Sequence, residues 1–186
     1  MMKRDQCLRV LAGHVKDEIV VATYSTANDW LAIADRPLNH FSWGAMGLAS
    51  SNALGLALAF PDRRVIVLDG DGSLLMNLGT LVTIAGASPR NLVHFVCQNN
   101  TYEANGGHPL PCRDVDFAGI ARSAGISRCH TFAELSDFES RIGELLKGEG
   151  PIFTVLKIEQ GSISNIDYAD MYKPARRAAL RAALHR

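Results

Sequence analysis

Acidic and amide side chains stand directly after two apolar runs, and these are the residues best suited to chemistry. A Gly-Asp-Gly sequence occupies residues 70–72 after the run 65–69, and Asn99 follows the run 92–98. Apolar runs bounded by glycine favour buried parallel strands, and open α/β sheets bind ligands beyond the carboxyl ends of such strands. Glycine lets the backbone approach a phosphate, and carboxylate and carboxamide oxygens suit Mg²⁺. The pattern therefore predicts a metal–diphosphate site that contains Asp71 and Asn99.

These two clusters resemble the thiamine-diphosphate motif, in which Gly-Asp-Gly is followed by Asn-Asn at the end of the next strand. The resemblance implies a Mg²⁺ ion held by Asp71, by one asparagine side chain and by a backbone carbonyl two residues further on. The strand aligns best with Gln98 in place of the family's first Asn. On that alignment Asn99, rather than Asn100, is the ligand, and Thr101 supplies the carbonyl. The alternative is an ordinary strand-turn-helix with a capping aspartate.

A second block, residues 40–59, supports the same resemblance. It is similar to the family's Gly-Ser-Met-Gly segment, which opens a helix of small residues, expected here over 45–59. The resemblance implies that the Gly44 carbonyl accepts a hydrogen bond from the 4′-amino group of the cofactor's pyrimidine. It also implies that Met46 forces the cofactor into its V shape. Both are candidate catalytic residues, although Met46 taken alone is typical of a core position.

A third segment, after a strand expected over 18–22, is predicted to contact the diphosphate. Thr23 and Thr26 stand where related enzymes bind diphosphate oxygens, whereas Tyr24 stands where the family usually has glycine. The alternative is that Ser25 and Thr26 only cap a helix. The full set of residues that the resemblance places against the cofactor is Thr23, Thr26, Gly44, Ala45, Met46, Gly70, Asp71, Gly72, Ser73, Asn99, Thr101, Tyr102 and Glu103.

In layout the chain is most similar to sulfopyruvate and phosphonopyruvate decarboxylases, and the resemblance covers nearly its whole length. It departs from their pattern at Ala104 and at His108, where relatives tend to carry Gln. His108 is a third candidate catalytic residue, as a proton donor or an anion contact, or else a polar loop residue. The family implies a thiamine-diphosphate-dependent decarboxylase of a small, anionic 2-oxo acid. The alternatives are a carboligase subunit and a non-catalytic cofactor-binding subunit.

The glutamate that this family places against the cofactor's pyrimidine has no counterpart in the motifs of the chain. In the family it comes from a separate pyrimidine-binding domain, and the cofactor lies between the two domains. The resemblance therefore implies a separate pyrimidine-binding (alpha-type) subunit, in a heterotetramer or a larger assembly. Thiamine diphosphate and Mg²⁺ are the expected cofactors.

The composition argues against several other classes of protein. The chain has 186 residues, is 47% hydrophobic and balances 19 basic against 19 acidic residues, so no nucleic acid partner is indicated. No apolar window is long enough to span a membrane, and the first residues lack the hydrophobic region of a signal peptide. Four cysteines without paired spacing are typical of reduced thiols and argue against an iron–sulfur cluster. A cytoplasmic protein is expected.

Strand and helix patterns alternate along the chain, which predicts a three-layer α/β/α fold around a mainly parallel sheet. Residues 1–186 are interpreted as a single thiamine-diphosphate-binding domain, with a C-terminal tail and helix at about 160–186. Pro174 suits the first turn of that helix, whose basic face is either solvated or docked on a partner. The expected strands are 18–22, 65–69, 92–98 and 152–157, and the expected earlier helices are 4–14, 45–59, 74–87, 116–124 and 134–147.

Overall fold

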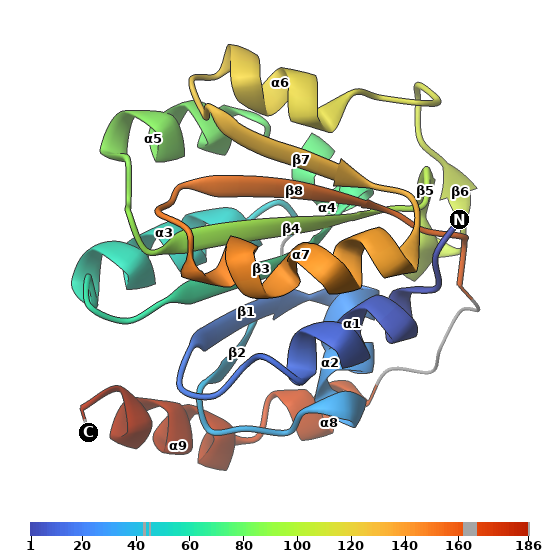
Figure 1. The fold of residues 1–186 in the computed structure, drawn as a ribbon. Coiled ribbons are helices and arrows are strands. Elements are labelled where there is room, and N and C mark those ends of the chain that lie inside the picture. The colour runs from blue at the N-terminus through green and yellow to red at the C-terminus, as the bar shows by residue number, and fades with distance from the viewer. Residues whose placement is uncertain (43, 45, 162–166, 186) are drawn as a thin grey trace.

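The computed structural model describes residues 1–42, 44, 46–161 and 167–185, and its centre is one parallel sheet (Figure 1). The strands lie in the order β2-β1-β3-β4-β8-β7, and every neighbouring pair is parallel. They are β1 (Ile19–Thr23), β2 (Asn39–Ser42), β3 (Val65–Gly70), β4 (Leu92–Gln98), β7 (Arg128–Phe132) and β8 (Ile152–Lys157). A short antiparallel hairpin, β5 (Thr101–Tyr102) with β6 (His108–Pro109), follows β4.

Helices cover both faces of this sheet, which confirms the predicted three-layer α/β/α fold (Figure 1). One layer contains α1 (Arg4–Ala12), α2 (Tyr24–Ile33) and α7 (Leu135–Lys147). The other contains α3 (Ala49–Ala59), α5 (Gly79–Ala87) and α6 (Phe117–Ser123). None of the helices in the described part of the chain is both long and apolar enough to cross a bilayer.

Side chains of the strands alternate between two cores, because successive residues of a strand point to opposite faces of the sheet. In β3, Ile66 and Leu68 belong to the core under α1, α2 and α7, whereas Val65 and Val67 belong to the core under α3, α5 and α6. All four are buried, so the strand reads as a continuous apolar run. Since the strands are parallel, the carboxyl ends of β1, β3 and β4 meet at one edge of the sheet.

The structure corrects several element boundaries. The expected single helix over 74–87 is wrong: α4 (Asp71–Leu75) and α5 are separate helices. Between them Asn77 donates a hydrogen bond of 3.0 Å to the carbonyl of Gly47. The helix expected from residue 45 begins at Ala49, because Gly47 has a φ of +85°, a left-handed conformation that an α-helix does not contain.

The strands β2 and β7 are not among those predicted from the sequence, and there is a physical reason for this. They are the two outer strands of the sheet, and an outer strand tolerates polar residues because one of its edges is not paired. β2 reads Asn-His-Phe-Ser and β7 reads Arg-Cys-His-Thr-Phe. Neither has the apolar run that marks the central strands.

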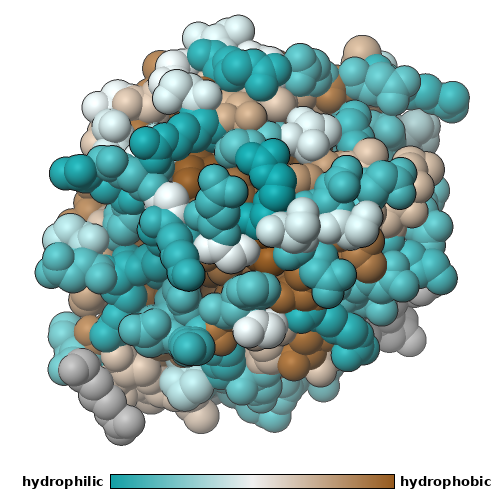
Figure 2. Space-filling model, in the orientation of Figure 1, coloured by the Kyte–Doolittle hydropathy of each residue, from teal (hydrophilic) through white to brown (hydrophobic). Residues whose placement is uncertain are grey.

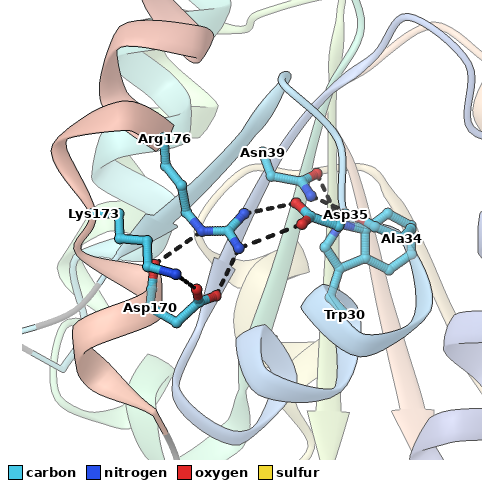
Figure 3. A network of polar contacts seen from close by, with 7 residues as sticks. All are labelled: Trp30, Ala34, Asp35, Asn39, Asp170, Lys173 and Arg176. Atoms are coloured by element: carbon cyan, nitrogen blue, oxygen red, sulfur yellow. Dashed lines mark hydrogen bonds and ion pairs between the residues drawn. The ribbon is translucent and has the colours of Figure 1, made fainter.

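The C-terminal helices pack beside the outer strand β2. Helix α8 (Tyr168–Met171) leads into α9 (Pro174–Leu184), which confirms the helix predicted near the C-terminus. Arg176 of α9 links this helix to α8 and to the segment after α2 (Figure 3): its guanidinium lies 2.6 Å from Asp35 and 2.7 Å from Asp170. Arg63 also donates a hydrogen bond of 3.0 Å to the carbonyl of Ala183 near the end of α9. The basic face of α9 is therefore partly engaged within this chain.

Candidate cofactor site

A hollow lies at the carboxyl ends of β1, β3 and β4, with about 410 Å³ of space not occupied by atoms, part of it open to solvent. All the residues predicted to contact the cofactor line it, except Gly44, which is exposed, and Ala45, which lies outside the described residues. The lining residues are Arg4, Thr23, Tyr24, Ser25, Thr26, Met46, Gly70, Asp71, Gly72, Ser73, Cys97, Asn99, Thr101, Tyr102, Glu103 and Ala104.

Asp71 opens helix α4 at the base of this hollow and is almost fully buried. Its Oδ1 accepts a hydrogen bond of 2.8 Å from the backbone N–H of Gly72, and its Oδ2 accepts one of 2.6 Å from that of Asn100. Burial raises the pKa of this carboxyl to about 6, and the backbone hydrogen bonds only partly oppose the shift. A cation bound in the hollow would favour the ionised form.

Asn99 follows β4 and lies in the same hollow as Asp71. Its Oδ1 accepts hydrogen bonds from the backbone N–H of Thr101 at 2.9 Å and from the Thr101 hydroxyl at 3.1 Å. Asn100, by contrast, does not line the hollow, and its side-chain oxygen accepts a hydrogen bond from Gln98. This arrangement supports the choice of Asn99 over Asn100 as the oxygen donor.

The two glycines beside Asp71 act differently. A Cβ on Gly72 would lie 2.6 Å from the Cδ1 atom of Tyr102, so the packed ring leaves no room for a side chain. A Cβ on Gly70 would meet no atom within 4 Å, although Gly70 lines the hollow. Gly70 therefore keeps open a space beside the backbone that a ligand could occupy.

The site also contains an ion pair that sequence reasoning missed. Arg4, from the N-terminal helix, lies 2.8 Å from a carboxylate oxygen of Glu103 and 2.7 Å from one of Asp29. Burial favours the neutral acid, but the hydrogen bond and the charge of Arg4 outweigh it and hold the pKa of Glu103 below its ordinary value. One signal was available: Arg4 stands on the same helix face as the buried Cys7, Leu8 and Leu11.

Met46 and Tyr24 border the hollow in unusual backbone surroundings. The residue after Met46, Gly47, is fixed by Ser73, whose hydroxyl accepts its N–H at 3.1 Å. Tyr24 has a φ of +47°, in the left-handed region that favours glycine, and this explains why a glycine would suit its position. His108 lies on the exposed hairpin strand β6 and does not line the hollow.

The sequence match agrees with this geometry. Residues 22–156 match the family model described as the C-terminal TPP binding domain of thiamine pyrophosphate enzymes. The chain therefore belongs to the thiamine pyrophosphate (thiamine diphosphate) enzymes.

Its relatives include named decarboxylases. Sulfopyruvate decarboxylase subunit beta of Methanothermobacter thermautotrophicus is 36% identical over 163 residues, which are 87% of this chain and 85% of that protein. Phosphonopyruvate decarboxylase of Streptomyces viridochromogenes is 35% identical over 159 residues, which are 85% of this chain but 40% of that protein. Among solved structures, benzoylformate decarboxylase of Polynucleobacter necessarius shares the fold, with a TM-score of 0.74, 21% identity, and coverage of 85% of this chain and 33% of that chain.

Proposed function

We propose that this chain binds thiamine diphosphate through Mg²⁺ and acts as the beta-type subunit of a decarboxylase of a small, anionic 2-oxo acid. The observation that carries the proposal is the convergence of two oxygen donors, Asp71 and Asn99, in one hollow beside the open backbone of Gly70. In the proposed site Asp71, the Asn99 side chain and the Thr101 carbonyl hold the ion. Thr23 and Thr26 face the diphosphate.

The residues present fit that cofactor. Within the described part of the chain Asp71 accepts hydrogen bonds from the backbone N–H groups of Gly72 and Asn100 and has no ion pair with a cationic side chain. A buried carboxylate of this kind is well suited to a divalent ion. When bound, thiamine diphosphate supplies the electron sink that decarboxylation needs. The chain's own residues would orient it: Met46 would pack against the cofactor, and the carbonyl of Gly44 would accept a hydrogen bond from its aminopyrimidine.

The acid–base partner of the pyrimidine is assigned to another subunit. In the described part of the chain Glu103 is the one glutamate that lines the hollow, and it is already paired with Arg4 and bonded by Asn99. A relative that the chain matches over 85% of its length is named subunit beta, which implies a partner for that protein. We therefore assign the missing glutamate to a pyrimidine-domain subunit.

An uncharged surface beside the site supports such a partner. Residues 46–61 and 72–89, which include α3 and α5, contain no charged residue. Their exposed positions combine large apolar side chains, such as Leu58 (57% exposed) and Val82 (62% exposed), with uncharged polar ones, such as Asn52 and Thr83. In contrast, the face drawn in Figure 2, with α1 and α7 in front, presents mostly hydrophilic side chains.

An outer helix face with no charged side chain and with exposed Leu and Val is unusual for a solvated surface, so these outer faces are suited to a protein partner. A Cβ atom added at Gly55, Gly79 or Gly86 would meet no other atom within 4 Å. Glycines in such open positions allow another protein backbone to approach closely. The surface also borders the hollow, because α4 begins at Asp71 and Leu48 follows the loop that contains Met46. A subunit bound there would reach the cofactor.

The proposed function is tested by product analysis. The purified chain is assayed for carbon dioxide release from sulfopyruvate, phosphonopyruvate and pyruvate, with and without a candidate pyrimidine-domain subunit. We expect no turnover from the chain alone, and release of free aldehyde when both subunits are present. Robust activity of the chain alone would contradict the split site, whereas a hydroxyketone product would indicate a carboligase.

A further inference from the structure

Glu103 makes contacts that reach well beyond the hollow. Its side chain is 4% exposed, and Arg4, from the N-terminal helix, lies 2.8 Å from its Oε1. Its Oε2 accepts two hydrogen bonds, one of 2.9 Å from the Asn99 side-chain amide and one of 3.0 Å from the backbone N–H of Gly161. One carboxylate thus joins the first helix, the loop after β4 and the segment after β8.

The chemistry of this contact decides which way the Asn99 amide faces. An ionised carboxylate only accepts hydrogen bonds, so the Asn99 atom beside Glu103 must be the donating nitrogen. The oxygen of Asn99 is then directed away from Glu103. It lies on the side of the amide where the N–H and hydroxyl of Thr101 donate to it. The Thr101 N–H therefore holds the oxygen end of the amide, and Glu103 holds the nitrogen end. Without an acceptor at position 103, the nitrogen end would lose this contact and the oxygen would be held less firmly in place.

We propose that Glu103, itself held by Arg4 and by the Gly161 N–H, is a positioning residue that makes Asn99 present its oxygen to the metal ion. The inference rests on the proposed function, because it concerns how the proposed ligand is oriented. Arg4 contributes the permanent charge that keeps an acceptor-only carboxylate at this buried position. The outer partners of metal ligands commonly change metal affinity about ten- to a hundredfold when they are removed.

Mn²⁺ binding to the full chain, measured by electron paramagnetic resonance with thiamine diphosphate present, tests the proposal without an activity assay. Glu103→Ala and Asn99→Ala should each weaken Mn²⁺ binding at least about tenfold. The double variant should bind no more weakly than Asn99→Ala, because Glu103 acts through Asn99. Additive losses in the double variant would overturn the positioning role.

A matched control separates positioning from general stability. Asp29→Ala removes the other ion pair of Arg4, at 2.7 Å, and leaves the bond between Glu103 and Asn99 in place. It should lower the melting temperature, while Mn²⁺ affinity stays within about twofold of wild type because no bond to Asn99 is lost. A loss as large as that of Glu103→Ala would overturn the proposal. If Glu103→Ala fails to fold, Glu103→Met fills a similar volume without an oxygen acceptor and should still weaken Mn²⁺ binding, because the Asn99 amide loses its acceptor.

The metal site itself is checked by Asp71→Ala. Equal Mn²⁺ affinity in wild type and Asp71→Ala would overturn the proposed metal site and the role of Glu103 with it. Loss of binding in Asp71→Ala together with unchanged binding in Glu103→Ala would overturn the positioning role alone.

Discussion

Gly70 and Gly72 flank the same carboxylate, but they are glycines for different reasons, and this difference is testable. Gly70→Ala should leave the melting temperature close to wild type, because its Cβ would meet no atom within 4 Å. It should weaken binding of thiamine diphosphate, since that Cβ enters the hollow. Gly72→Ala should instead destabilise the fold by about 1–3 kcal/mol, because its Cβ would overlap the Tyr102 ring.

Thermal unfolding and isothermal titration, applied to both glycine variants, give the comparison. Each variant serves as the control of the other, since the substitution is the same and the positions are two residues apart. A Gly70→Ala protein that binds the cofactor as well as wild type would contradict the assignment of the diphosphate to this side of the hollow.

Met46 is the second residue with a distinct expected effect. It lines the hollow but makes none of the oxygen contacts proposed for the ion. Met46→Ala should therefore reduce turnover of the assembled enzyme far more than cofactor affinity, because the bent cofactor loses its support while the diphosphate contacts stay. Steady-state kinetics and cofactor titration measure the two quantities. Equal losses of turnover and of cofactor affinity would mean that Met46 is only a packing residue.

Among the elements, the docking of α9 beside β2 depends on charge. Arg176 pairs with Asp35 and Asp170, whereas the next residue, Arg177, is exposed and forms no ion pair with any residue that the structure describes. Arg176→Ala should lower the melting temperature at low ionic strength, and high salt should shrink the difference from wild type, because salt screens exposed ion pairs. Arg177→Ala is the matched control and should change little. A salt-independent difference for Arg176→Ala would mean that packing, not charge, dominates the contact.

The elements also show where sequence patterns succeed. β3 and β4 are buried on both faces, so their apolar runs mark them clearly. The outer strands β2 and β7 carry polar residues and lack such a run. The strands with which they pair, β1 and β8, are fixed by the tertiary packing rather than by a local sequence pattern. Helix α4 is only five residues long, too short for a periodic pattern to separate it from α5.

For the molecule as a whole, the uncharged surface of α3 and α5 predicts where a second subunit binds. Val82→Lys should leave the fold of this chain intact, because the side chain is 62% exposed. It should prevent association with the pyrimidine-domain subunit, because a charge would be buried without a partner. Light scattering of the mixed subunits measures the assembly.

The control for this surface lies on the opposite layer of the molecule. Glu139→Lys introduces the same side chain at an exposed position of α7 and should leave assembly unchanged. Normal assembly by Val82→Lys would place the partner on another face.

The sequence by itself determined the central strands and the convergence of Asp71 with Asn99. Both follow from local information: apolar runs predict parallel strands, and parallel strands bring their carboxyl ends to one edge. Only the tertiary structure brought Arg4 to Glu103, 99 positions away, and set the C-terminal segment against the same carboxylate. It also left His108 on an exposed hairpin outside the hollow. Contacts of this kind depend on how elements that are distant in the sequence pack together, and a local sequence pattern does not predict that packing.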